Sequence, residues 1–138
     1  DNAANLSVQL ERIVEDARSD GGPQIELEVL AEHAPANVAN CFAAVLREAL
    51  SNTMRHAHAQ NVTVRCMEHP SFYQLIVTDD GTGATKTNSR GIAEGMGLGS
   101  MRERVEALGG TFTAGPRAGA PGWRVFATVP KQQGDDAR

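Results

Sequence analysis

One helical pattern, from residue 36 to residue 59, constrains the fold of this chain more than any other feature. Apolar side chains recur along it at the spacing of a helix with one buried face. They are Val38, Phe42, Val45, Leu46, Ala49, Leu50 and Met54. A second stripe, roughly 100° around the helix from the first, consists of Glu48, Asn52, Arg55 and His56. This stripe lies at the rim of the core, either as a solvated flank with intrahelical pairs or as groups that reach a ligand.

The segments around this helix predict one domain over residues 1–130, followed by a polar tail at 131–138 that we expect to be disordered. Further helices are predicted at 5–18 and 100–108, and the segment 84–94 has no pattern and is predicted to be a mobile loop. Strands are predicted at 25–30, 61–66, 72–78, 111–114 and 123–129. This order predicts an α/β fold: a two-layer sandwich with a mixed, mainly antiparallel sheet and its three helices on one face.

Composition excludes some classes of function. The net charge of −4 and pI near 5.5 argue against a general nucleic-acid binder, and no apolar run is long enough for a membrane span. Cys41 and Cys66 have no metal-ligand spacing and are expected to be buried thiols of a reducing compartment. The four histidines are not spaced as a metal site. The chain begins at Asp1 rather than methionine, so we expect it to be part of a longer protein.

The motif Asp-Asp-Gly-Thr-Gly at 79–83 follows a predicted buried strand. It has the composition of a tight turn. It does not have the alternating acidic residues or the closing glutamate of a calcium loop. The other interpretation is a carboxylate at the end of a strand, followed by glycines that let a flat ligand lie against the backbone. Such an acceptor suits the exocyclic amine of a purine.

The motif Gly-Met-Gly-Leu-Gly at 95–99 opens the last predicted helix. It is either a flexible loop or a phosphate site, because exposed N–H groups at a helix start attract anions. The chain has no Gly-Lys-Ser/Thr, which excludes a P-loop. A dinucleotide fingerprint would require a preceding strand and a third glycine at the position of Ser100, so it is excluded as well.

Together and in this order, the three motifs resemble those of the ATP-binding catalytic domain of sensor histidine kinases. Residues 47–59 resemble the N box, 79–83 the G1 box and 95–104 the G2 box. The first and third are most similar to the NarX/DesK-like branch of the GHKL superfamily. The resemblance covers residues 6–130 and implies the Bergerat fold, in agreement with the predicted order of elements.

The resemblance also implies a role for each motif residue. Asn52 would coordinate Mg²⁺ through its amide oxygen, and Glu48 would be the catalytic base or orient a metal-bound water. Asp79 would accept a hydrogen bond from the adenine amine. The others would contact phosphate or make room for the base: Arg55, His56, Gly81, Gly83, Gly95, Gly97, Leu98 and Gly99. Residues 84–94 would form the ATP lid, and Trp123 stands where many relatives have a threonine on the adenine side.

The implied function is to bind Mg-ATP and donate the γ-phosphoryl group to a histidine on a separate dimerisation domain, for relay to a NarL-type response regulator. Phosphoryl transfer needs an in-line nucleophile, and this chain has no acceptor hairpin. We therefore expect a cytoplasmic, monomeric domain with no nucleic-acid partner and no membrane segment, from a parent kinase that can itself be membrane-anchored. Two alternatives are a serine kinase of the anti-sigma-factor type and a nucleotide-gated conformational module of the gyrase kind.

Overall fold

The computed structural model describes residues 6–18, 21–31, 33–81 and 97–132, and the observations below concern these residues. The predicted helices and strands are present in the predicted order, with ends that differ by only a few residues. The helices are α1 (Leu6–Ala17), α2 (Ala36–Asn52) and α3 (Leu98–Glu106), and a π-helical turn, η2 (Thr53–Ala57), extends α2. The strands are β1 (Gln24–Val29), β2 (Asn61–Glu68), β3 (Phe72–Asp79), β4 (Thr111–Pro116) and β5 (Trp123–Pro130).

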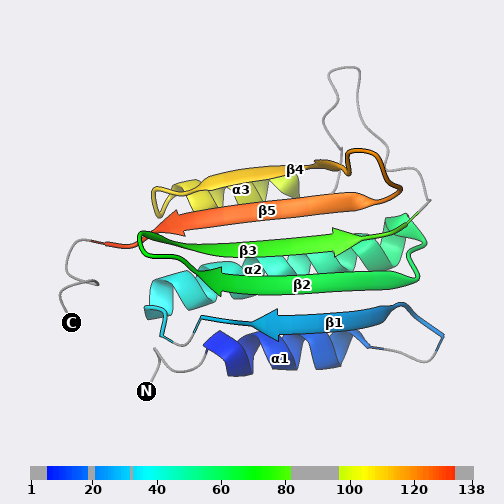
Figure 1. Ribbon diagram of the computed structural model, residues 1–138, viewed down its shortest axis with the longest axis horizontal. Coiled ribbons are helices and arrows are strands. Elements are labelled where there is room, and N and C mark those ends of the chain that lie inside the picture. The colour runs from blue at the N-terminus through cyan, green and yellow to red at the C-terminus, as the bar shows by residue number, and fades with distance from the viewer. Residues whose placement is uncertain (1–5, 19–20, 32, 82–96, 133–138) are drawn as a thin grey trace.

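The five strands form one mixed sheet in the order β1-β2-β3-β5-β4. β1 and β2 are parallel, and the other three neighbouring pairs are antiparallel. Because parallel neighbours need a crossover, α2 connects β1 to β2. Figure 1 shows all three helices on the same face of the sheet. The predicted two-layer α/β sandwich is therefore confirmed.

The core lies between the sheet and the helices, and strand alternation decides which residues enter it. On β3 the residues Tyr73, Leu75, Val77 and Asp79 are buried, and their neighbours in the sequence are less so. The predicted apolar face of α2 is buried from Val38 to Leu50. The last buried residue of β3 is an aspartate, so a polar side chain lies at this end of the apolar core.

The central helical segment extends from Ala36 to Ala57, close to the predicted 36–59, but its last turn is not a regular α-helix. The α-helix ends at Asn52, the backbone widens into the π-helical turn η2, and His58 then takes a left-handed conformation with φ of 52°. The extra residue in a π turn shifts the side chains that follow it, and such turns are frequent at functional sites. Met54, predicted on the buried face, is accordingly 37% exposed.

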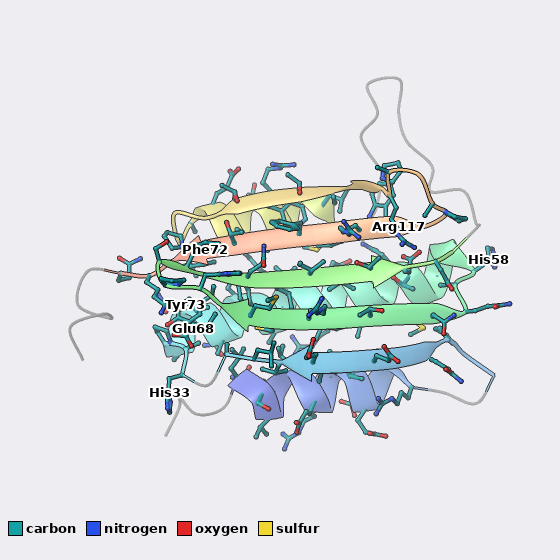
Figure 2. All side chains as sticks on the ribbon, viewed as in Figure 1. His33, His58, Glu68, Phe72, Tyr73 and Arg117 are labelled. Carbon is teal, nitrogen blue, oxygen red and sulfur yellow. The ribbon has the colours of Figure 1, made fainter. Side chains whose placement is uncertain are left out.

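Lys131, expected at the start of the tail, is held against the sheet. Its backbone N–H donates to the Ser71 carbonyl at 2.9 Å, and its ammonium lies 2.7 Å from the Glu68 carboxylate. The ammonium is also 5.4 Å from the centroid of the Tyr73 ring. Figure 2 labels Glu68 and Tyr73 at this end of the sheet, opposite His58. The ordered domain thus includes Lys131, whereas 133–138 lie outside the described residues.

Candidate functional site

Two contacts bring the three sequence motifs together beside the end of α2. The Thr53 hydroxyl at the end of α2 lies 3.3 Å from a carboxylate oxygen of Asp79 at the end of β3. A Cβ on Gly97, at the start of α3, would lie 2.8 Å from the Glu48 carboxylate. In Figure 1 the end of α2 and the tip of β3 lie at the same end of the molecule. Residues about 50 positions apart, such as Glu48 and Gly97, therefore belong to one site.

Asp79 is buried, with 4% of its surface exposed, and donors from two elements contact its carboxylate. The N–H of Gly81 donates to Oδ1 at 2.9 Å, and the hydroxyl of Thr53 donates to Oδ2 at 3.3 Å. Strand alternation turns the side chain toward the helical layer. Each oxygen retains acceptor capacity, so the carboxylate is held in place and can still accept a hydrogen bond from a ligand.

Asp80, the next residue, has a different environment. Its carboxylate accepts hydrogen bonds from the backbone N–H groups of Gln60 and Asn61 and from the Asn61 side-chain amide, each at 2.9 Å. These bonds, that of the Asn61 side chain foremost, hold the pKa of Asp80 below its ordinary value because they favour the charged form. Asp80 therefore ties the start of β2 to the end of β3.

The polar stripe of α2 divides into a buried and an exposed part. Asn52 is 6% exposed, and its Oδ1 accepts a hydrogen bond from Arg55 Nη2 at 3.0 Å. The same guanidinium nitrogen lies 3.9 Å from Glu48 Oε2, and about half of the Arg55 side chain is exposed. Asn52, Arg55 and Glu48 thus lie together, as the helical spacing predicted. His56 lies within η2, but its side chain is outside what the structure describes.

Gly97 begins α3 in a left-handed conformation, with φ of 68°, that favours glycine. Among the described residues, no side-chain hydrogen bond caps this helix start. The first N–H groups of a helix have no intrahelical acceptor, so those of Leu98 and Gly99 are available to an anion. Gly83, Gly95 and the expected ATP lid at 84–94 lie outside the described residues.

The oxygen donors at the site suit a magnesium ion carried by phosphate rather than one caged by the protein. Within the described segments, no three His, Cys, Asp or Glu residues are grouped to hold a metal. Mg²⁺ prefers oxygen ligands and usually combines one or two protein ligands with water and substrate phosphates. The Asn52 amide oxygen, with the Glu48 carboxylate nearby, fits that pattern. The oxygen of Asn52 already faces a cation, the Arg55 guanidinium.

Two residues of the site, Thr53 and Gly122, were not predicted from the sequence, and a third, Trp123, was noted only because it replaces the threonine of many relatives. Thr53 contacts Asp79. The sequence feature that could have indicated this contact is a polar residue next to Asn52, on the inner side of a helix. Gly122 has φ of 120°, and a Cβ there would overlap the Asp79 carbonyl. Trp123, partly buried against the core, pairs directly with Asp79 across the sheet. No local pattern shows such pairing between strands.

A cavity of about 880 Å³ lies between α1 and the end of α2, next to this site. Its lining includes Leu50, Met54 and Arg55, but neither Asp79 nor Gly97. The cavity therefore adjoins the place where the sequence motifs meet, with Arg55 at the boundary.

The two cysteines are buried free thiols, as expected, and lie away from this chemistry. Burial raises the pKa of the Cys66 thiol to about 12 and also raises that of Cys41. A thiol needs its ionised form to react, so neither is activated as a nucleophile. Among the described residues, no helix has both the length and the apolar character needed to cross a bilayer.

Residues 37–133 match the family described as "Histidine kinase-, DNA gyrase B-, and HSP90-like ATPase". The chain is 36% identical over 88 residues to the signal transduction histidine-protein kinase/phosphatase UhpB of Salmonella typhimurium, covering 64% of this chain and 16% of UhpB. It is 33% identical over 96 residues to the nitrate/nitrite sensor protein NarQ of Escherichia coli (68% and 16%). It is 46% identical over 77 residues to the sensor histidine kinase NarS of Mycobacterium tuberculosis (53% and 18%).

Solved structures show the same fold. The Acinetobacter baumannii histidine kinase AdeS superposes with a TM-score of 0.72 at 17% identity, over 92% of this chain and 65% of that one. The mycobacterial sensor histidine kinase MprB gives 0.59 at 21% identity, over 91% of each chain.

The chain belongs to the histidine kinase-, DNA gyrase B- and HSP90-like ATPase family. Within it, the chain is an ATP-binding catalytic domain of the sensor histidine kinase class, and the resemblance to NarX-like kinases is confirmed. The chain spans about a sixth of the length of UhpB and NarQ.

Proposed function

We propose that this domain binds Mg-ATP and donates the γ-phosphoryl group to a histidine on a separate dimerisation domain of its parent protein. The observation that carries this proposal is the convergence, around the end of α2, of a buried carboxylate, a buried amide oxygen and a helix start that no described side chain caps. These groups match, in order, an adenine amine, a phosphate-bound cation and a phosphate chain.

At the adenine end, Asp79 would accept the hydrogen bond of the exocyclic amine. A buried acceptor with fixed neighbours favours a ligand that brings a donor, because an unpaired buried polar group costs about 1–3 kcal/mol. Gly81 contributes its N–H to Asp79 and leaves room for the base. Gly83 would act in the same way.

At the phosphate end, the N–H groups of Gly97, Leu98 and Gly99 would bind phosphate oxygens, with Gly95 in the loop before them. Arg55 and His56 would lie beside the phosphates. Asn52 would hold Mg²⁺ through its amide oxygen, and the bound ion supplies positive charge that offsets the charge of the phosphates.

Glu48 would act on the acceptor. Transfer forms a bond between an imidazole nitrogen and the γ-phosphorus and breaks the bond from phosphorus to the bridging oxygen, which leaves with ADP. The Glu48 carboxylate, beside Gly97 at the start of α3, would accept a hydrogen bond from the second imidazole nitrogen and take its proton as positive charge develops. Its position one turn before Asn52 supports this role.

The parent kinase would pass the phosphoryl group to a response regulator of the NarL type, and similarity to NarQ and NarS supports this partner. We also propose that residues 1–130, together with the ordered Lys131, are the functional domain and act as a monomer when separate from the parent. A cytoplasmic position is supported by Cys41 and Cys66, which are free thiols as in reducing compartments.

The proposal is tested by supplying the missing acceptor. The chain is incubated with γ-labelled Mg-ATP and one of two candidate acceptors, a histidine-bearing helical hairpin from a NarX-like kinase or a sigma-antagonist protein. We expect acid-labile label on the hairpin only, and none with Glu48→Gln. Label on the sigma antagonist would instead support the serine kinase. ATP-dependent dimerisation without transfer would support a nucleotide-gated module.

A further inference from the structure

The sequence motifs assign no role to Thr53, yet its hydroxyl is one of the few polar groups buried beside the site. Thr53 is 6% exposed, and its Oγ1 lies 3.3 Å from Asp79 Oδ2. The two residues come from different elements, 26 positions apart. A valine would occupy nearly the same volume there, so packing alone does not require the hydroxyl.

The direction of this hydrogen bond follows from the chemistry of its two groups. An ionised carboxylate can only accept, so the threonine hydroxyl is the donor. The other carboxylate oxygen, Oδ1, accepts the N–H of Gly81 at 2.9 Å. The terminal torsion of an aspartate is broad by itself. Two donors on opposite oxygens therefore fix the plane of the Asp79 carboxylate.

Thr53 is itself held firmly. Its backbone N–H donates to the carbonyls of Ala49 and Leu50, where α2 changes into the π-helical turn. Its β-branched side chain has few rotamers. Asn52, the residue before it, is buried on the same turn. One helical turn therefore carries both the proposed metal ligand and a donor to the proposed adenine acceptor.

From this geometry we infer that Thr53 is a positioning residue for base recognition: its hydroxyl holds Asp79 in the orientation that accepts the amine of adenine. The inference rests on the proposed nucleotide site and adds to it a determinant of purine selectivity. A site built around a fixed hydrogen bond discriminates strongly against ligands that lack the matching group. Without the hydroxyl, Asp79 can turn away and part of that discrimination is lost.

The test compares Mg-ATP with the triphosphate of purine riboside, which lacks the 6-amino group, by calorimetry on the whole chain. In Thr53→Val we expect the Kd for ATP to rise about three- to tenfold, the range set by one hydrogen bond, and the Kd for the analogue to change less than twofold. Thr53→Ser keeps the hydroxyl and should restore most of the preference for ATP. Thermal unfolding of each variant checks that the fold is intact.

Equal weakening of both nucleotides in Thr53→Val, or a Thr53→Ser variant that behaves like Thr53→Val, would overturn the inference and leave Thr53 a packing residue. Failure of the proposed function has a different signature, because the wild-type chain would then bind neither nucleotide. A third outcome would separate the two proposals: wild type prefers ATP, Asp79→Ala loses this preference, and Thr53→Val keeps it. In that case the proposed nucleotide site is supported and the proposed role of Thr53 is wrong.

Discussion

At the end of β3, Asp79 and Asp80 are adjacent carboxylates whose neighbours give them different tasks. Asp79 is buried and accepts one hydrogen bond on each oxygen, so it can still accept from a ligand. The Asp80 carboxylate accepts three hydrogen bonds from N–H groups of Gln60 and Asn61, at the start of β2. The sequence motif contains both residues. The family resemblance assigns the adenine role to Asp79, and the three-dimensional contacts add a physical reason for assigning it to Asp79 rather than Asp80.

Removing the carboxylate of Asp79 should weaken nucleotide binding without unfolding the chain. Asp79→Ala leaves the adenine amine unpaired, at a cost of about 1–3 kcal/mol, so ATP affinity should fall about tenfold or more. Calorimetry measures this, and far-UV circular dichroism should be unchanged. Wild-type affinity in this variant would show that the adenine lies elsewhere.

Asp80 should instead control stability in acid. Its pKa is lower in the folded than in the unfolded chain, so its contribution to the free energy of unfolding is present above the ordinary aspartate pKa of about 4 and is lost as pH falls through the folded value. Asp80→Asn should lower the Tm at neutral pH and flatten its decline between pH 5 and 3. Thermal unfolding across that range tests this, and parallel curves for the two proteins would contradict it.

Asn52 should govern the dependence of ATP binding on magnesium. Its amide oxygen is the proposed metal ligand, so Asn52→Ala should reduce the difference in ATP affinity with and without Mg²⁺ and abolish phosphotransfer in the parent kinase. Ser51→Ala, one residue earlier and lining the neighbouring cavity, is the matched control. If the Asn52 variant matches wild type at limiting Mg²⁺, Asn52 is not in the metal site.

At the scale of elements, the start of α3 depends on one glycine. Gly97 has φ of 68°, and a Cβ there would press on the Glu48 carboxylate, whereas nothing lies within 4 Å of a Cβ on Gly99. Gly97→Ala should therefore lower the free energy of unfolding by roughly 1 kcal/mol. Gly99→Ala lies inside the helix and should not lower it, since alanine is the better helix former. Urea unfolding measures the free energy of unfolding of both variants. A Gly97→Ala variant as stable as wild type would contradict the argument that a side chain at position 97 is strained.

Helix and strand positions were predictable because each depends on local periodicity. The apolar spacing of α2 and the alternation along β3 both survive in the structure. The π turn η2 was not predictable, because a regular helix and a widened one have the same sequence spacing up to Asn52. The contact of Thr53 with Asp79 depends on how α2 packs on the sheet. Thr53 and Asp79 belong to separate local patterns, so the sequence predicts the helix and the strand but not the contact between them.

At the scale of the whole molecule, the five-stranded sheet supports the three helices, and the residues of the candidate site lie at one end of the helical layer. The opposite end is held by contacts of Lys131 with Glu68 and Tyr73. Figure 2 shows His33 near that end and His58 at the other. His69 stacks on Phe72 in the turn between β2 and β3, beside Glu68 and Tyr73. Neither His33 nor His69 therefore lies where α2 and α3 would hold a phosphate.

This arrangement predicts that the chain binds nucleotide but does not label itself. Phosphoryl transfer needs a nucleophile positioned in line with the leaving group. His56, which would lie beside the phosphates, is proposed as a binding residue and not as the acceptor. We expect Mg-ATP to bind in the micromolar to millimolar range, roughly −8 to −4 kcal/mol, with very slow hydrolysis and no phosphohistidine.

The chain is incubated with γ-labelled Mg-ATP and separated on a gel run without acid. The wild-type chain should carry no label, whether or not a histidine-bearing hairpin is added. Label should appear on the hairpin when it is present, and Asp79→Ala should reduce that labelling. Stoichiometric label on the chain itself would contradict a divided enzyme, because an acceptor would then lie within residues 1–138. Acid-stable label would point to a serine acceptor, since phosphohistidine is lost in acid, and would favour the serine kinase of the anti-sigma-factor type.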